Sequence, residues 1–318
     1  MVRKDEEALV SVVIPCYKQA HFLPEAIKSV LAQTYSGVEA IVVDDGSPDN
    51  TAQVAALFPG VNYVRQQNRG IAEARNAGFR ASQGNYVIFL DADDRLMPDA
   101  AKRHLQCFAE NPSAGFVVGD IDQIASDGSY LSSPRWPVLT SGFYEELLKA
   151  NHVANTIAVM FRRGVLEAIG GFKTFFVPAE DYEMLLRAGR QFSSAHHRTV
   201  VAQYRRYETS TSHKGAIMLR AMNRVMQLQQ PIVENSPTLR KALGKGEAYW
   251  RDHFGAAAVK EVYAQLVRCK LFAAAKSSAA LLWYVGWRLI VLPWTRRRRI
   301  FRIIRERFAY SQKLSSDS

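Results

Sequence analysis

Residues 10–45 read VSVVIPCYKQAHFLPEAIKSVLAQTYSGVEAIVVDD, and this stretch decides the fold. Its two apolar runs, 10–15 and 39–43, are rich in β-branched residues, which are typical of buried strands. Residues 23–33 between them place apolar side chains at helical spacing, and Pro24 suits a first helical turn. Continuous apolar strands joined by a helix predict a parallel sheet covered on both faces.

The same alternation continues along the chain. Further strands are predicted at 61–65 and 86–90, and further helices at 49–58, 71–82 and 98–110. The pattern is less regular from 112 to 150, where Asp127-Gly128 indicates a turn. A strand-like run at 155–161 follows, then a tight turn at Gly170-Gly171-Phe172 and a helix that begins at Glu180. From about 214 onward the sequence predicts helices, including 254–276 and 277–308. The predicted fold class is α/β: a Rossmann-like, mostly parallel sheet flanked by helices, with a C-terminal helical extension.

Polar residues follow each of the four predicted strands. In sheets of this type, ligands bind beyond the carboxyl ends of the strands. Four clusters therefore converge on one edge of the sheet: Pro15-Cys16-Tyr17, Asp44-Asp45-Gly46-Ser47, Arg65-Gln66-Gln67-Asn68 and Asp91-Ala92-Asp93-Asp94.

The carboxylates of Asp91 and Asp93 are candidates for a divalent cation site. Mg²⁺ and Mn²⁺ favour carboxylate and phosphate oxygens, and such an ion would neutralise a diphosphate leaving group. The alternative is that Asp93 and Asp94 begin and cap the helix near Pro98.

Asp45 and Tyr17 are candidates for the donor side of the site. The carboxylate of Asp45 would accept hydrogen bonds from a nucleobase or ribose, although Asp-Gly-Ser is also ordinary turn chemistry. The ring of Tyr17 would stack on a base, with simple packing as the alternative.

Three further residues have a functional and a structural interpretation. Asp181, beside Glu180 at a helix start, would be a general base, or would only complement the helix dipole. Arg75 would reach a phosphate or the donor sugar, or lie on a solvated helix face. His213 would touch the diphosphate or metal, or be an exposed loop histidine.

Composition places the basic character in the C-terminal part. The formal net charge is +11, and residues 260–318 carry 13 Lys and Arg against 3 Asp and Glu. The rest is therefore nearly neutral and need not bind a polyanion. Three scattered cysteines predict neither a disulfide framework nor a zinc site, and with the charged N-terminus they favour a cytoplasmic location. The sequence contains no P-loop, no G-x-G-x-x-G after the first strand and no G-x-S-x-G elbow.

Residues 277–308 combine tryptophans with an arginine-rich amphipathic pattern. We expect this segment to bind an anionic membrane surface, because Trp, Arg and Phe suit the headgroup zone. A single span or hairpin, and a helix packed on the body or in an oligomer, are the alternatives. Nucleic-acid binding is disfavoured, because no known nucleic-acid module accompanies the arginines.

Taken together, the ordered segments resemble glycosyltransferase family 2. They are VSVVIPCYKQAHFLPEAIKSVLAQTY, EAIVVDDGSPDNT, VRQQNRGIAEARNAGFRASQGNYVIFLDADD, IGGF and PAEDYEMLLRAG, and they cover about residues 9–210. The resemblance implies a GT-A fold, an inverting mechanism and a divalent cation, Mn²⁺ or Mg²⁺.

The resemblance also implies roles for individual residues. It places the pyrimidine base near Pro15, Tyr17 and Asp45, and the D-x-D site at Asp91 and Asp93. Asp93 is then the more direct metal ligand, Asp91 lies nearer the ribose, and Asp181 is the catalytic base. Many members have a Trp shortly after the Glu-Asp pair, where this chain has Tyr182-Glu183-Met184, which puts the details of the acceptor pocket in doubt.

The sequence therefore predicts a metal-assisted, inverting glycosyltransferase that uses a nucleotide-sugar donor, UDP-linked, and a glycan or lipid-linked acceptor at the inner face of the cell membrane. Residues 1–213 form the catalytic domain, with about 9–97 binding the donor and about 98–213 providing the acceptor side and base. Residues 214–318 form a helical, basic, membrane-associating region. One alternative is a sugar-nucleotidyltransferase, but such an enzyme needs a Gly-rich loop after the first strand, and this chain has none there. The other is an inactive homologue that acts as a membrane scaffold.

Overall fold

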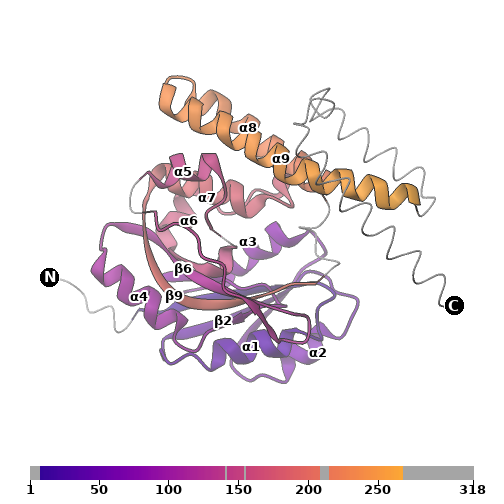
Figure 1. The fold of residues 1–318 in the computed structure, drawn as a ribbon. Helices are drawn as coiled ribbons and strands as arrows, with labels where there is room; N and C mark the ends of the chain where they lie inside the picture. The colour runs from indigo at the N-terminus through magenta and orange to yellow at the C-terminus, as the bar shows by residue number, and fades with distance from the viewer. Residues whose placement is uncertain (1–7, 140–141, 154, 208–214, 268–318) are drawn as a thin grey trace.

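A computed structural model describes residues 8–139, 142–153, 155–207 and 215–267 (Figure 1). The strands are β1 (Val10–Cys16), β2 (Val38–Asp44), β3 (Val61–Arg65), β4 (Tyr86–Phe89), β5 (Arg95–Leu96), β6 (Ala114–Ile124), β7 (Tyr130–Ser132), β8 (Val159–Arg162) and β9 (Ser193–Arg205). The helices are α1 (Leu23–Leu31), α2 (Thr51–Ala56), α3 (Ile71–Ala81), α4 (Ala100–Glu110), α5 (Phe143–Lys149), α6 (Arg163–Ile169), α7 (Glu180–Gln191), α8 (Gly215–Val233) and α9 (Pro237–Val267), with 3-10 turns η2 (Thr156–Ala158) and η3 (Thr174–Phe176).

Within these described ranges, the nine strands form one mixed sheet in the order β3-β2-β1-β4-β8-β6-β9-β5, and β7 pairs with β6. Strands β1 to β4 are parallel, as predicted. Strand β8 is antiparallel to both neighbours, whereas β6 and β9 run parallel to each other. The α/β class and the mostly parallel sheet are confirmed.

The second half of the sheet departs from the sequence expectation. The region from 112 to 150 contains the long strand β6, and β9 was not predicted at all. Strand β6 contains glycines at 115 and 119 and is polar in its second half, and β9 is mostly polar throughout. Neither strand therefore shows the clear alternation of apolar and polar residues that would have predicted it. The run at 155–161 begins as the turn η2, and only Val159 onward is strand.

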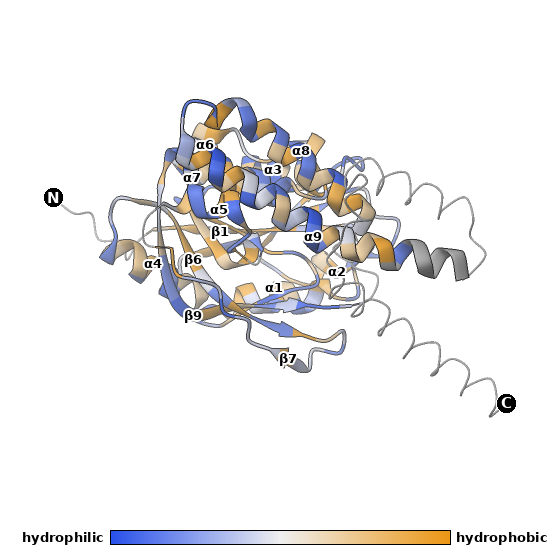
Figure 2. Cartoon of the chain, turned by 45° about the horizontal axis from the view of Figure 1, so that its top comes forward, coloured by the Kyte–Doolittle hydropathy of each residue, from blue (hydrophilic) through white to orange (hydrophobic). Residues whose placement is uncertain are grey.

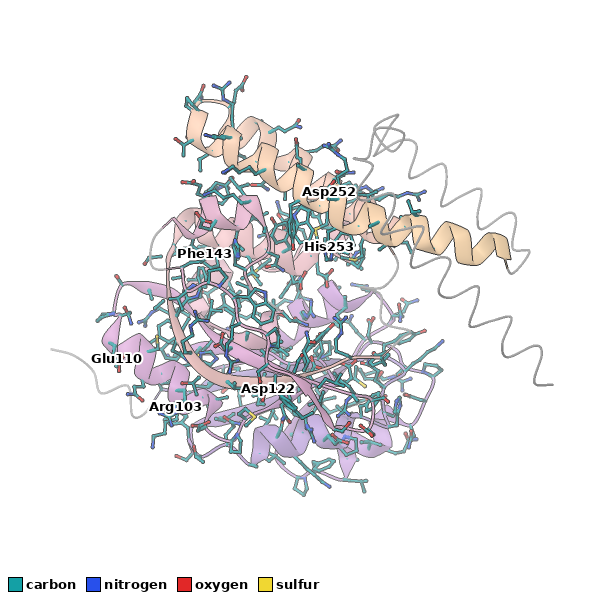
Figure 3. The ribbon with its side chains drawn as sticks, in the orientation of Figure 1. Arg103, Glu110, Asp122, Phe143, Asp252 and His253 are labelled. Carbon is teal, nitrogen blue, oxygen red and sulfur yellow. The ribbon has the colours of Figure 1, made fainter. Side chains whose placement is uncertain are left out.

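Helices cover both faces of the sheet (Figure 1). Helices α1 and α2 lie on one face, and α3, α6 and α7 on the other. Helix α3 lies close to β1 and β2 because residue 78 is glycine: a Cβ there would stand 2.2 Å from Cγ1 of Val13. On α5, Phe143 packs its ring on Phe116 of β6, with 5.0 Å between ring centroids (Figure 3).

Helices α8 and α9 form an antiparallel pair stacked on α5 and α7 (Figure 1). Helix α9 runs unbroken from Pro237, whereas the sequence suggested a helix starting near 254, so that boundary was wrong. Contact is closest at Gly246, where a Cβ would lie 1.8 Å from the carbonyl oxygen of Leu148. Figure 2 shows that apolar and polar residues mix along this pair.

The predicted membrane segment, 277–308, lies outside the described residues. Within the described part, no helix combines the length and apolar character needed to cross a bilayer. The described cysteines, Cys16 and Cys107, are buried and free.

Candidate active site

A cleft of about 430 Å³ opens beyond the carboxyl ends of β1 and β4, a size typical of small-molecule sites. Side chains from the sheet edge and α3 line one side: Pro15, Gln19, Ile71, Arg75, Asp91, Asp93, Tyr204, Arg205 and Tyr207. The other side is lined by Asn151, Asn155, Val177, Pro178, Glu180, Asp181, Tyr182, Met218, Met222, Trp250 and Phe254. Elements from the whole described chain therefore meet at this cleft.

Asp91 and Asp93 lie together on the cleft wall just after β4. The hydroxyl of Tyr207 donates a hydrogen bond of 2.6 Å to Oδ2 of Asp93. Burial and then the nearby Asp91 carboxylate raise the pKa of Asp93, and the Tyr207 hydroxyl opposes this. The two carboxylates thus repel each other at a partly desolvated site.

Asp94 does not cap the following helix, because the N-cap of α4 is Asp99. Instead Oδ1 of Asp94 accepts a 2.7 Å hydrogen bond from the backbone N–H of Arg205, and the Nε of Arg205 donates to the carbonyl of Asp93. The guanidinium of Arg205 also pairs with Glu25 at 2.7 Å. The last residue of β9 therefore fixes the D-x-D turn, because β9 pairs with β5, the strand that directly follows this turn.

Arg75 joins the two sides of the cleft. From α3, one guanidinium nitrogen lies 2.7 Å from Oδ1 of Asp91, and another lies 2.9 Å from Oε1 of Glu180. The side chain is only 3% exposed, so the solvated-face interpretation is wrong. Its Nε and Oε2 of Glu180 are buried without a hydrogen-bond partner.

Asp181 is the second residue of α7 and faces the cleft. Its Oδ1 accepts a 2.7 Å hydrogen bond from the backbone N–H of Tyr182. Burial raises the pKa of Asp181, Arg75 opposes this, and Asp91 adds to it. Burial likewise raises the pKa of Glu180, again against Arg75. Glu180 and Asp181 therefore lie at the start of a helix and also line the cleft, so their position agrees with both interpretations.

The predicted base-binding residues are more dispersed. Pro15 lines the cleft, but Tyr17 and Asp45 do not. Asp45 is buried, and its carboxylate accepts hydrogen bonds of 2.8 Å from the backbone N–H groups of Arg69 and Gly70. It therefore closes the loop between β3 and α3, while Tyr17 is 42% exposed. His213 lies outside the described residues.

The sequence missed much of the cleft. Arg205 and Tyr207 arrive from the end of the unpredicted β9, and no pattern marked them. Trp250 and Phe254 come from α9, whose predicted start near residue 254 left Trp250 outside any predicted helix. The ring of Trp250 meets that of Tyr182 edge-on, with 5.3 Å between centroids, and its Nε1 donates to the Tyr182 hydroxyl at 3.4 Å. Tyr182 directly follows the Glu-Asp pair, and an aromatic cluster around it is completed from α9.

The acidic groups fit a divalent cation. Among the described residues, no three carboxylate, histidine or cysteine side chains converge as a self-sufficient metal site. Mg²⁺ sites commonly use one or two carboxylates together with substrate phosphates. Asp91 and Asp93 are such a pair. Burial and then the charge of Asp91 raise the pKa of Asp93, and a cation would relieve the repulsion between the two carboxylates.

Comparison with known sequences gives a family and several relatives. A family model described as Glycosyl transferase family 2 matches residues 11–170. An uncharacterized glycosyltransferase of Haemophilus influenzae is 30% identical over 182 residues, 56% of this chain and 61% of the relative. A chondroitin synthase of Escherichia coli is 30% identical over 184 residues, 56% of this chain but 26% of that enzyme. The matched part thus spans less than two thirds of these relatives.

Comparison with solved structures identifies the fold. Staphylococcus aureus TarS residues 1–349, in complex with UDP, superposes with a TM-score of 0.55 at 17% identity, covering 90% of this chain and 93% of that 1–349 chain. The mannosyltransferase PcManGT of Pyrobaculum calidifontis, in complex with GDP-Man and Mn²⁺, gives 0.55 at 23% identity, covering 88% and 83%. The fold is of the GT-A type, as the sequence resemblance implied.

The family match covers half of the 318 residues and includes β1, α3 and β4, the elements that bring Pro15, Arg75, Asp91 and Asp93 to the cleft. This chain belongs to glycosyl transferase family 2.

Proposed function

We propose that this protein is an inverting glycosyltransferase that moves a sugar from a nucleotide diphosphate to an acceptor hydroxyl. The observation that carries the proposal is that Asp91, Asp93 and Asp181 line one cleft, although 88 residues of sequence separate the last two. The donor is proposed to be UDP-linked, because a TarS structure holds UDP and another holds UDP-GlcNAc. PcManGT, which holds GDP-Man, keeps a GDP-sugar as the alternative donor.

Asp181 is proposed as the general base that takes the proton of the acceptor hydroxyl. A base works best when its pKa lies near the operating pH, and burial shifts the pKa of Asp181 upward in that direction. Arg75, which pairs with the neighbouring Glu180, opposes this rise. The deprotonated oxygen then attacks the anomeric carbon from the face opposite the nucleotide, which inverts its configuration.

Asp91 and Asp93 are proposed to hold Mn²⁺ or Mg²⁺ with the donor diphosphate. When bound there, the cation would offset the charge that develops on the departing diphosphate. Tyr207 keeps the Asp93 carboxylate in place through its 2.6 Å hydrogen bond. Pro15, Tyr17 and Asp45 remain the proposed base-binding side, with Asp91 nearer the ribose, and His213 a proposed diphosphate contact.

The acceptor is proposed to be a glycan or a lipid-linked sugar that enters on the side of α8 and α9. Relatives named chondroitin synthase and hyaluronan synthase support a glycan product. The apolar residues Met218, Met222 and Phe254 line this side of the cleft. We propose that the protein works at the inner face of the cell membrane, held there by its basic C-terminal segment.

The test separates donor binding from transfer. Asp181→Asn keeps the shape of the side chain but cannot accept the proton. We expect thermal stabilisation by UDP with Mn²⁺ to match wild type, and transfer to fall by at least about 100-fold. The matched control is Glu167→Gln, an exposed carboxylate on α6, which is expected to keep full activity.

Donor hydrolysis by the wild-type protein, with and without a chelator, tests the proposal as a whole. Release of the nucleoside diphosphate that stops with chelation supports a metal-assisted transferase. Pyrophosphate release from a nucleoside triphosphate and a sugar phosphate would identify a nucleotidyltransferase instead. No hydrolysis and no stabilisation by any nucleotide-sugar would identify an inactive scaffold.

A further inference from the structure

Helix α8 carries exposed apolar residues beside its buried side. Its buried side places Met218 and Met222 in the cleft wall, and both side chains are nearly fully buried. Next to that side, Leu228 and Ile232 are about two-fifths exposed, at 40% and 42%. Exposed apolar side chains that gather in one stripe, unlike singly scattered ones, indicate a further contact.

The exposed apolar residues continue from α8 onto the turn before the proposed base. Phe175, on η3, is 68% exposed, and the guanidinium carbon of Arg224 lies 5.2 Å from the centre of its ring. Arg224, Leu228 and Ile232 follow one another at four-residue intervals, so they share one side of α8. Phe175, Arg224, Leu228 and Ile232 therefore form one strip, called here the outer strip.

The outer strip is positively charged. The 19 residues of α8, all described, contain Arg220 and Arg224 but no Asp or Glu. The strip thus combines aliphatic and aromatic side chains with arginine, the composition of surfaces that lie in the headgroup zone of a bilayer. Anionic lipids attract such a surface, whereas the acidic floor of the cleft would be repelled.

We infer that the outer strip is a membrane-docking face of the catalytic body, and that its partner is an anionic lipid bilayer. The same positive charge continues in sequence beyond α9, because residues 268–318 contain 12 Lys and Arg against 2 Asp and Glu. A docking strip on the body together with a basic C-terminal segment would orient the molecule, whereas the segment alone would only tether it.

Docking through this strip would turn the acceptor side of the cleft toward the lipid. Val177, two residues after Phe175, lines the cleft and is also partly exposed. Met218 and Met222 lie on the adjacent, buried side of the helix that carries the strip. An acceptor that extends from the bilayer would therefore reach the cleft past η3 and α8 without the enzyme leaving the surface.

The experiment uses the full-length protein with a fluorophore that responds to polarity. The label is placed at Leu228→Cys in a Cys269→Ser background, since Cys16 and Cys107 are buried. The matched control is Leu57→Cys, which follows α2, is 74% exposed and is not part of the strip. With vesicles containing phosphatidylglycerol, we expect a blue shift at position 228 and none at 57. Pure phosphatidylcholine vesicles are expected to give a much smaller shift.

A second measurement tests the energetic contribution of the strip. The triple variant Phe175→Ser, Leu228→Ser, Ile232→Ser is expected to lower the vesicle-bound fraction several-fold. The control, Leu31→Ser with Leu57→Ser, removes two exposed leucines elsewhere and is expected to bind as wild type. Thermal stabilisation by UDP checks that both proteins fold, and it does not depend on docking.

Three results would overturn the inference. One is vesicle binding without a shift at 228, which would mean that other parts of the chain dock alone. Another is a shift at 228 that grows with protein concentration in the absence of vesicles, which would assign the strip to a second copy of the chain. The third is unchanged vesicle binding by the folded triple variant.

Discussion

The side of the cleft formed by the sheet is acidic and polar, whereas the side formed by α8 and α9 is apolar. Asp91 and Asp93 follow a strand and lie within a polar network that includes Arg75 and Tyr207. On the helical side, Met222 and Phe254 face the cleft from two packed helices. Charge that develops during a reaction is stabilised by the first kind of surface and not by the second.

The two sides also differ in how far the family match extends. The match ends at residue 170, so it includes Asp91 and Asp93 but neither α8 nor α9. The helical side therefore lies outside the matched residues, and so does Asp181, which lines the same cleft. We expect acceptor choice to depend on the helical side, and the two sides of the cleft can be perturbed separately.

The largest effect on folding is expected from removing Arg75, which joins the two sides. Arg75→Met leaves the carboxylates of Asp91 and Glu180 in a desolvated place without a countercharge. Breaking a buried ion pair in this way costs about 3–5 kcal/mol of stability. Urea unfolding followed by circular dichroism would measure the loss.

Glu180→Gln is the matched partner for this experiment. It keeps Arg75 paired with Asp91, so a smaller loss is expected. The double variant should be less destabilised than the sum of the two single variants, because both remove the same pair. An unfolding midpoint of Arg75→Met equal to that of wild type would show that Arg75 does not join the two sides.

The next effect concerns how tightly the helical side is attached. Gly246→Ala places a Cβ 1.8 Å from the carbonyl oxygen of Leu148, so α9 must shift away from α5. Overpacking of this kind costs roughly 1–3 kcal/mol. Gly244→Ala, on the same helix with no atom within 4 Å of its added Cβ, is the control. It should be neutral or stabilising by up to about 1 kcal/mol, since alanine favours helix.

Activity sharpens this experiment. If the helical side selects the acceptor, Gly246→Ala raises the acceptor KM while the donor Kd stays unchanged. If Gly246→Ala folds and keeps the wild-type acceptor KM, the position of α9 does not affect acceptor binding.

The sheet side was largely predictable from sequence, for a physical reason. Each βα unit is local, and the apolar run of a buried strand ends where polar residues begin. The positions of Asp91 and Asp93 at the sheet edge therefore follow from residues 86–94 alone. Arg75 was placed correctly on its helix, but its pairing with Glu180 depends on a helix 105 residues away in sequence.

The rest depends on strand register that no local pattern encodes. Tyr207 meets Asp93 only because β9 pairs with β6, and this pairing contains several register shifts. Each shift changes which side chain arrives at the sheet edge, so alternation within β9 cannot predict it. Trp250 is a similar case, since its contact with Tyr182 follows from the packing of α9 on α5.

A smaller effect is expected from changing the methionines of α8, one of which lines the cleft while another is buried in the core. Met222 and Met226 are both buried, one turn apart, but only Met222 lines the cleft. Exchange of Met for Leu keeps the volume and costs less than about 1.5 kcal/mol at either site. Met222→Leu is expected to raise the acceptor KM several-fold with kcat nearly unchanged, and Met226→Leu to leave both constants at wild-type values. Equal acceptor KM values for the two variants would show that acceptor binding does not reach this helix.

The smallest effect is expected on the pH dependence of stability, through a histidine pair that joins β9 to α4. On β9, His197 lies 3.1 Å from His104 of α4, measured between ring nitrogens. Burial lowers the pKa of His197 from 6.5 to about 4, helped by Arg103, which projects from α4 (Figure 3). Burial also lowers the pKa of His104, and His197 adds to this.

Unfolding would free both histidines to take up protons near pH 6.5 that the folded pair accepts only at lower pH. Their contribution to stability is therefore fully present above pH 6.5 and is lost as the pH falls toward about 4. Buried carboxylates such as Asp94, whose pKa is raised, act in the opposite sense, so the total slope alone is not diagnostic. His104→Gln removes one titrating group of the pair, and we expect its melting temperature to fall less steeply with acidification than that of wild type. His21→Gln, at an exposed position, should keep the wild-type slope, and a His104→Gln slope as steep as wild type would mean that this pair does not link β9 to pH.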